Sequence, residues 1–250
     1  MGWNSWYECS EGVSAEKIKE VADAFVKSGL RDHGWTYINI DDCWQGDRDP
    51  KTKALMGNER FPDMKGLCDY VHERGLKIGI YSSPWIGTYA GFRGGTSDNP
   101  DAADPKCLPE DKRLQPNQIF GRQGTKDMGI SFFNAPRIGK YWFLDRDFKA
   151  MADWGFDYIK LDWHPNDVPT TERMAKELRA SGRDIVMSLS NTAPIKNAPE
   201  LSKLAQLWRT GPDIHDSWDS ISRCFNEFDW VKFQSPGHWN DMDMLQVGMR

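Results

Sequence analysis

The feature that most constrains the fold is a cycle of short apolar strands and amphipathic helices that repeats along the chain. Ser14 is a typical N-cap, and the apolar positions after it keep a helical spacing up to the stop signal at Gly29. The same kinds of signal predict further elements, in chain order: strand Tyr37–Ile40, helix Met64–Arg74, strand Leu76–Tyr81, helix Trp142–Trp154, strand Asp157–Leu161, helix Thr171–Ala180, strand Ile185–Leu189, a short helix near Glu200–Leu204, strand Leu207–Arg209 and helix Ser217–Phe228.

Alternating strands and helices predict an α/β fold with parallel strands and right-handed crossovers. Polar residues stand just beyond the carboxyl ends of these strands, where barrels and doubly wound sheets both place their chemistry: Asp41, Asp162, Ser190 and Asp213. About seven strand starts are recognisable and no eighth, and MGW opens inside the first strand. We therefore expect a TIM-type (β/α)8 barrel cut short before its last βα unit, in a chain whose two ends are fragment ends.

Length and charge exclude several classes of protein. The 250 residues carry a formal charge of −5, which argues against a basic nucleic-acid footprint. A mean hydropathy of −0.68 and the lack of any apolar stretch near the ~18 residues of a membrane span predict a soluble globular domain. The opening MGWNSWYECS has neither a basic n-region nor an apolar h-region, so we expect no secretory signal in this chain.

One segment lacks the periodicity of the rest. From Ser82 to about Lys140, Gly, Pro, Asp and Asn dominate, which predicts a long loop insertion in a single catalytic barrel over residues 1–250. Because the insertion follows the third predicted strand, we expect it to lie over the carboxyl face of the barrel and to shape the side of the site that binds the leaving group.

Two acidic residues are candidates for catalysis. Asp162 follows Lys160 by two positions on a strand, so both side chains point to the same face. The cation is expected to depress the pKa of Asp162 and keep it ionised, as a nucleophile must be, although such a pair alone is more often a structural ion pair. Asp213 follows Arg209 by four residues, after a Gly-Pro turn that offers its carboxyl group to a cleft. Its alternative role is to cap the next helix, for which Asp216 is better placed.

Two carboxyl groups from different strand ends, one ionised and one protonatable, are the minimum equipment for glycosidic bond cleavage. A competing use of the acids is a metal site built from Asp41, Asp42, Asp213 and His215. The nearby Lys160 and Arg209 argue against that site. The five cysteines lack zinc-site spacing, and no glycine-rich phosphate loop follows a strand, so neither a metal nor another cofactor is expected.

Six motifs in a fixed order extend this interpretation: MGWNSW, YINIDDCW, FPDMKGLCDYVHERGLKIGIYS, DWGFDYIKLD, WRTGPDI followed by SW, and GHWNDMDML. Together they resemble the motifs of glycoside hydrolase family 27, which holds α-galactosidases and α-N-acetylgalactosaminidases. The similarity runs from Met1 to about Gly248, with Ser82–Lys140 as its main gap.

The resemblance implies a retaining mechanism on a (β/α)8 barrel, with Asp162 at the nucleophile position and Asp213 at the acid/base position. It also implies a set of sugar contacts: Trp6 packs on the ring, Asp41 and Asp42 bind the axial 4-hydroxyl and the 6-hydroxyl, Lys160 reaches the 3- and 4-hydroxyls, Arg209 reaches the 2-position, and Asp243 lies near the acid/base.

The loop after the fifth strand separates the two activities in this family by residue size. Galactosidases present Glu and a larger apolar residue there, and N-acetylgalactosaminidases present Ser and Ala. The corresponding residues here are Ser190 and Ala193, both small. This leaves room for a 2-acetamido group or for a water molecule.

The chain departs from the family pattern in its cysteines and its length. The family cysteine after the nucleophile is His164 here, and its partner is Tyr89, so that disulfide cannot form. Cys9 lies two residues before the family cysteine that pairs with the one matching Cys43, which leaves a Cys9–Cys43 bridge as a hypothesis. The family's C-terminal β-sandwich is absent from residues 1–250.

The resemblance favours a retaining exo-α-galactosidase, secreted or periplasmic, that acts on oligosaccharides or polysaccharides with terminal α-galactosyl groups and binds no nucleic acid or membrane. Alternatives within the clan are an α-N-acetylgalactosaminidase, a β-L-arabinopyranosidase or an isomaltose-releasing enzyme. Arabinopyranosidases replace the first acid of the pair with Glu, and this chain keeps Asp41. An alternative of another class is an inactive carbohydrate-binding barrel fragment.

Overall fold

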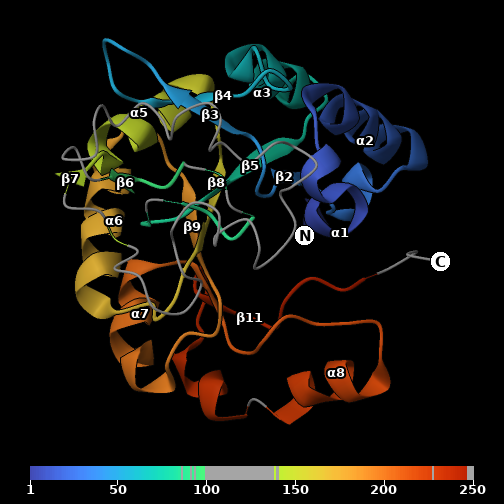
Figure 1. Ribbon diagram of the computed structural model, residues 1–250. Helices are drawn as coiled ribbons and strands as arrows, with labels where there is room; N and C mark the ends of the chain where they lie inside the picture. Colours follow the sequence, from blue (N-terminus) through green and yellow to red (C-terminus); the bar gives the residue numbers. More distant parts are fainter. Residues whose placement is uncertain are drawn as a thin grey trace.

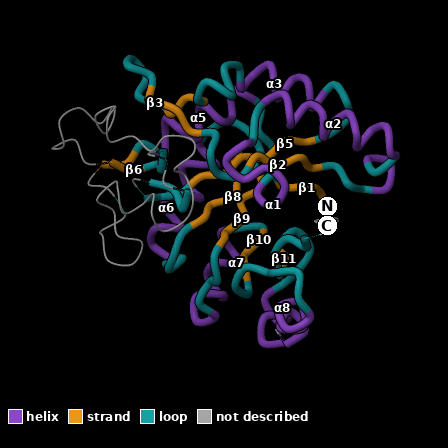
Figure 2. The backbone as a smooth tube through the Cα atoms, turned by 45° about the vertical axis from the view of Figure 1, so that its right-hand side comes forward, coloured by secondary structure: helices purple, strands orange, loops and turns teal. Residues whose placement is uncertain are grey.

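The computed structural model describes residues 1–85, 87–90, 92, 94–98, 138, 141–226 and 228–246. The main feature of this part is one curved sheet of seven strands whose spatial order is their chain order (Figures 1 and 2). Every neighbouring pair is parallel. The strands are β1 (Gly2–Asn4), β2 (Tyr37–Ile40), β5 (Lys77–Ser82), β8 (Tyr158–Asp162), β9 (Val186–Ser190), β10 (Leu207–Arg209) and β11 (Trp239–Asp241).

Helices connect these strands and form an outer layer around the sheet, as Figure 2 shows. Successive helices α2, α3, α5, α6 and α7 pack against one another, and α2, α3 and α7 also contact strands of the sheet. The helices are α1 (Trp6–Cys9), α2 (Ala15–Ser28), α3 (Met64–His72), α5 (Leu144–Trp154), α6 (Val168–Ala180), α7 (Ala198–Leu204) and α8 (Trp218–Ser222). The predicted α/β class and parallel pairing are confirmed, and the described residues form a seven-stranded part of a β/α barrel.

Helix α2 illustrates why these segments fold locally. Ser14 accepts a hydrogen bond from the Lys17 amide at 3.2 Å, and Gly29 ends the helix with a φ of 79° that glycine adopts without strain. Between these caps one face is buried in the core, including Ile18, Val21 and Phe25. The sequence predicted these bounds because both caps and the apolar stripe agree.

The helix predicted over Ser217–Phe228 is shorter in the structure. Helix α8 ends at Ser222 and gives way to 3-10 turns at Arg223–Asn226 and Phe228–Phe233. Trp218 is 73% exposed, and Ser220 is the buried residue of the helix. With little apolar surface to bury, tertiary packing does not stabilise a longer helix. The N-cap is Ser217, whose side chain accepts from the Ser220 amide, and not Asp216.

Two small antiparallel pairs lie beside the main sheet, and the sequence predicted neither. Strands β3 (Gln45–Arg48) and β4 (Leu55–Gly57) form one pair. Strands β6 (Ser97–Asp98) and β7 (Tyr141–Trp142) form the other, which moves the start of α5 from the predicted Trp142 to Leu144. Most of the predicted insertion, from residue 99 to 137, lies outside the described residues.

The hypothesised Cys9–Cys43 bridge is not formed, because both residues carry free thiols. Burial in the core raises the pKa of the Cys43 thiol far above its usual range. None of the helices in the described ranges has the length and apolar character that crossing a bilayer requires.

Candidate active site

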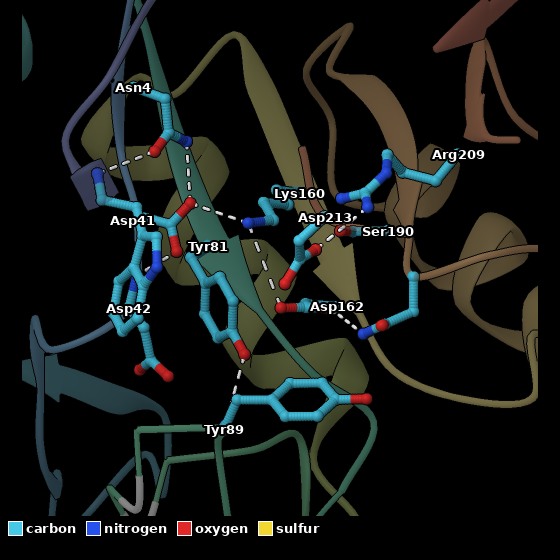
Figure 3. A network of polar contacts seen from close by, with 12 residues as sticks. Asn4, Asp41, Asp42, Tyr81, Tyr89, Lys160, Asp162, Ser190, Arg209 and Asp213 are labelled. Atoms are coloured by element: carbon cyan, nitrogen blue, oxygen red, sulfur yellow. Dashed lines mark hydrogen bonds and ion pairs between the residues drawn. The ribbon is translucent and has the colours of Figure 1, made fainter. Parts of the chain in front are cut away.

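The carboxyl ends of the strands bring the predicted polar residues together. Lys160 pairs in register with Tyr81 of β5, and Asp162 pairs with Ser190 of β9. Figure 3 shows Asp41, Lys160, Asp162, Arg209 and Asp213 converging on one region at this edge of the sheet. Parallel strands place their carboxyl ends on one side, so residues distant in sequence meet there.

Lys160 lies between two carboxylates. Its Nζ is 2.8 Å from Asp41 Oδ2 and 4.0 Å from Asp162 Oδ2. It also lies over the ring of Tyr81, 5.4 Å from the centroid, within the range of a cation–π contact. Burial opposes the charge of Lys160, yet Asp41 and Asp162 raise its pKa above the usual value, so the lysine is a permanent cation.

The predicted direction of the Asp162 pKa shift is wrong. Burial raises the pKa of Asp162 to about 6, although Lys160 lowers it as expected, while Asp41 and Asp213 raise it. Desolvation therefore exceeds the attraction of the lysine. At pH 7 a carboxyl group with this pKa is still mostly ionised.

Asp42 is buried beside Asp41, and each of its carboxyl oxygens accepts a hydrogen bond from a backbone amide. Its Oδ1 accepts from the Cys43 amide at 2.7 Å, and its Oδ2 accepts from the Ala90 amide at 2.8 Å. Burial raises the pKa of Asp42 to about 7, against the effect of the hydrogen bonds from Ala90, Thr88 and Cys43. Asp42 thus links the end of β2 to the segment that follows β5.

Arg209 lies between a second pair of carboxylates. Its Nη2 is 3.0 Å from Asp213 Oδ1, and its Nη1 is 2.9 Å from Asp243 Oδ1. The Asp213 side chain is 69% exposed, whereas the Arg209 and Asp243 side chains are 4% and 2% exposed. In Figure 3 Asp213 and Asp162 lie in the same region, and Asp213 contributes to the raised pKa of Asp162.

Three residues of this network were missed from the sequence. Asn4 donates to Asp41 Oδ2 at 2.7 Å and accepts from the Trp6 amide at 2.9 Å. Asn191 donates to Asp162 Oδ1 at 2.5 Å. The Tyr81 hydroxyl accepts from the Tyr89 amide at 3.5 Å. Each stands at or just beyond a strand end, which is the signal that could have identified them.

The remaining predicted residues surround this network. Trp6 begins α1 and packs partly against the core. Ser190 and Ala193 are both buried at the end of β9 and in the loop after it. The backbone amide of His215 donates to Ser220 Oγ. In the described ranges, no group of three or more His, Cys, Asp or Glu side chains is arranged to hold a metal ion.

Comparisons with known proteins show what the chain is similar to. The model of a family described as alpha galactosidase A matches residues 4–110 and 118–249. An alpha-galactosidase of Oryza sativa subsp. japonica is 33% identical over 256 residues, covering 99% of this chain and 51% of that protein. An alpha-N-acetylgalactosaminidase of Homo sapiens is 33% identical over 276 residues, covering 99% of this chain and 56% of that protein.

Among solved structures, alpha-galactosidase I from Mortierella vinacea has a TM-score of 0.76 at 26% sequence identity. The match covers 99% of this chain and 59% of that chain. The chain spans about half the length of the curated relatives it matches.

Proposed function

The chain belongs to the alpha galactosidase A family, glycoside hydrolase family 27, and from this premise we propose that it is the catalytic barrel of a retaining exo-α-galactosidase. The observation that carries the proposal is that Asp162 and Asp213 both lie at the carboxyl edge of the sheet, each next to a cation, with Asp213 near enough to contribute to the raised pKa of Asp162 (Figure 3). Retaining glycosidases use a pair of carboxyl groups that flank the scissile bond.

In the proposed mechanism Asp162 attacks the anomeric carbon while Asp213 gives a proton to the glycosidic oxygen. The galactosyl group is then bonded to Asp162, and Asp213 takes a proton from the water that releases it. Burial suits Asp162 to the first role, because it removes competing water, and the exposure of Asp213 lets it reach a leaving group. Lys160 compensates the charge of Asp162 before attack.

The other predicted site residues are proposed to bind the galactose. Asp41 and Asp42 would accept from the 4- and 6-hydroxyls, because carboxyl oxygens are hydrogen-bond acceptors. The remaining contacts follow the family pattern, with Trp6 against the ring, Lys160 at the 3- and 4-hydroxyls, Ser190 and Arg209 at the 2-position, and Asp243 near the acid/base.

The wider organisation is also a proposal. We place the seven strands in a (β/α)8 barrel. The substrate would be an oligosaccharide or polysaccharide with terminal α-galactosyl groups. A secreted or periplasmic enzyme fits a substrate of this kind.

The test is the pair of variants Asp162→Ala and Asp213→Ala, assayed on p-nitrophenyl α-galactoside. Each should lose nearly all activity, and Asp153→Ala, which removes an exposed carboxylate of α5, should not. Azide should restore turnover of Asp162→Ala and yield β-galactosyl azide, because it replaces the missing nucleophile. If azide instead yields β-galactosyl azide with Asp213→Ala, then Asp213 is the nucleophile and Asp162 is the acid/base.

A second candidate activity, α-N-acetylgalactosaminidase, is favoured by the small side chains at Ser190 and Ala193. The kcat/KM values for the α-galactoside and the α-N-acetylgalactosaminide decide between them. A preference for galactose beyond about a thousandfold, roughly 4 kcal/mol of transition-state discrimination, would exclude a roomy 2-position. Binding of galactose without turnover of either substrate would support a carbohydrate-binding barrel instead.

A further inference from the structure

The two oxygens of Asp162 have different neighbours. Asn191 Nδ2 donates to Oδ1 at 2.5 Å, whereas Oδ2 lies 4.0 Å from Lys160 Nζ. Asn191 follows β9 directly and has a left-handed φ of 61°, which asparagine tolerates better than most residues. With this backbone conformation, the side-chain amide of Asn191 donates its hydrogen bond to the Asp162 carboxyl group.

A second asparagine holds the loop that carries Asn191. Asn166 is fully buried, and its Nδ2 donates to the Trp163 carbonyl at 2.9 Å and to the Ser190 carbonyl at 3.0 Å. The amide therefore joins the segment after β8 to the end of β9. On the far side of the loop, the Ala193 amide donates to the Arg209 carbonyl at 3.0 Å, so both flanks of Asn191 are anchored.

We propose that Asn166 and Asn191 are positioning residues for the nucleophile: Asn166 fixes the loop after β9, and Asn191 holds Asp162 Oδ1 so that Oδ2 attacks. The proposal rests on the proposed role of Asp162. In the step concerned, the bond between Asp162 Oδ2 and the anomeric carbon forms and the glycosidic bond breaks. Its electron pair goes to the leaving oxygen, which takes the proton of Asp213.

The hydrogen bond from Asn191 can persist through this step. Oδ1 becomes the carbonyl oxygen of the glycosyl ester, which still accepts a hydrogen bond. Before the step, the bond limits rotation of the carboxylate and favours its ionised form. Correct orientation of a reacting atom is worth a large factor in rate.

Asn191→Gly is the direct test, because glycine keeps the left-handed backbone and removes the amide. On p-nitrophenyl α-galactoside, kcat/KM should fall by about 10- to 100-fold, the range for a hydrogen bond to a charged group. KM should change by less than about threefold, and the acid limb of the pH profile should move to higher pH. The control is Lys53→Gly, at a half-buried left-handed position of the β3–β4 turn, which should leave kcat/KM, KM and the pH profile unchanged.

Asn191→Asp keeps the shape of the side chain and removes its donor, so it serves if the glycine variant folds poorly. It should move the acid limb further in the same direction because a second carboxylate faces Asp162. Unchanged pH profiles in both variants would overturn the proposal.

Asn166→Gly tests whether Asn166 acts through Asn191. It should lower kcat/KM and move the acid limb in the same direction, and the double variant should be no slower than Asn191→Gly alone. Additive losses would overturn the coupling of the two residues. If Asp162→Ala keeps its activity, the proposed function fails; if only the asparagine variants behave as wild type, the positioning role fails and the proposed function stands.

Discussion

At the scale of single residues, burial and a neighbouring cation act on Asp162 in opposite directions, and burial has the larger effect. The Lys160–Asp162 spacing on one strand predicted the contact correctly, since side chains two apart share a face. The size of the desolvation penalty depends on how the strands beside β8 bury Asp162, which local sequence does not reveal.

The first prediction concerns the pH dependence of the reaction. Asp162 must be ionised to attack, and its pKa is raised to about 6, so the acid limb of kcat/KM should have its midpoint near pH 6 and fall about tenfold per pH unit below it. The measurement is kcat/KM on p-nitrophenyl α-galactoside from pH 4 to 8. A limb near pH 4 would contradict the dominance of burial, and Asp153→Asn, on the outer surface, should leave the profile as it is.

The second prediction concerns stability and Asp42. Its folded pKa of about 7 lies above its ordinary value of 3.8, so the folded state binds this proton more tightly than the unfolded chain does. The stability that Asp42 contributes is then present below about pH 4 and is lost as the pH rises to about 7. Relative to wild type, the free energy of unfolding of Asp42→Asn should rise across this window, by at most about 1.4 kcal/mol per pH unit.

Urea unfolding of both proteins at pH 5, 6, 7 and 8 measures this difference. It should grow between pH 5 and 7 and level off by pH 8. Asp49→Asn is a suitable control, because backbone amides lower the pKa of Asp49 below its ordinary value of 3.8. Asp49 is then ionised in both the folded and the unfolded state at pH 5 to 8, so the difference between Asp49→Asn and wild type should not change over this range. A difference that does not vary with pH would mean that Asp42 is ionised throughout.

In the network around Asp162, some residues could be identified from the sequence, and the contacts of others could not. Lys160, Asp162 and Arg209 could be found because spacing and strand ends point to them. Asn191 follows a strand end, yet its contact with Asp162 could not be predicted, because it depends on the left-handed backbone of Asn191 in the folded loop. Asn4 was part of a recognised motif, yet only the pairing of β1 with β2 places it against Asp41.

At the scale of elements, segments with two caps and a buried stripe were predicted closely, and short polar strands were not. Strand β3 reads Gln-Gly-Asp-Arg, which has no alternation of apolar side chains. Its last residue, Arg48, makes a buried ion pair with Asp147 of α5, 2.6 Å apart, which stabilises the strand against the helix. Arg48 also donates to the carbonyls of Lys53 and Gly95, so one side chain ties together the β3–β4 pair, α5 and the base of the insertion.

The third prediction follows from this contact. Arg48→Met leaves the Asp147 carboxylate buried without its cation, which should cost about 3–5 kcal/mol in the free energy of unfolding. Urea unfolding is the measurement. The double variant Arg48→Met/Asp147→Leu should recover most of the loss, because it removes both charges. Lys149→Ala, which breaks an exposed pair with Asp153 on the same helix, should cost about 0.5 kcal/mol or less.

For the whole molecule, the order of the seven strands could be predicted from the alternation of strands and helices. Consecutive parallel strands are joined by right-handed crossovers, so each strand lies beside the one before it in the chain. How the first and last strands approach each other could not, because it depends on contacts between loops far apart in the chain. The Tyr7 hydroxyl of α1 donates to the Ile214 carbonyl at 2.9 Å, which joins the segment after β1 to the segment after β10.

The last prediction concerns this link, because Ile214 directly follows the proposed acid/base Asp213. Its carbonyl accepts from Tyr7 and Gln246, and its amide donates to Asp243 at 2.8 Å, so three side chains fix the backbone beside Asp213. Tyr7→Phe removes one of these bonds and should cost about 0.5–1.5 kcal/mol in stability. A less firmly held proton donor matters most when the leaving group is basic, so kcat/KM should fall several-fold more on an alkyl α-galactoside than on p-nitrophenyl α-galactoside. Tyr70→Phe, which breaks an exposed bond to Asp23, should change neither rate. Equal losses on the two substrates would show that Tyr7 stabilises the fold without orienting Asp213.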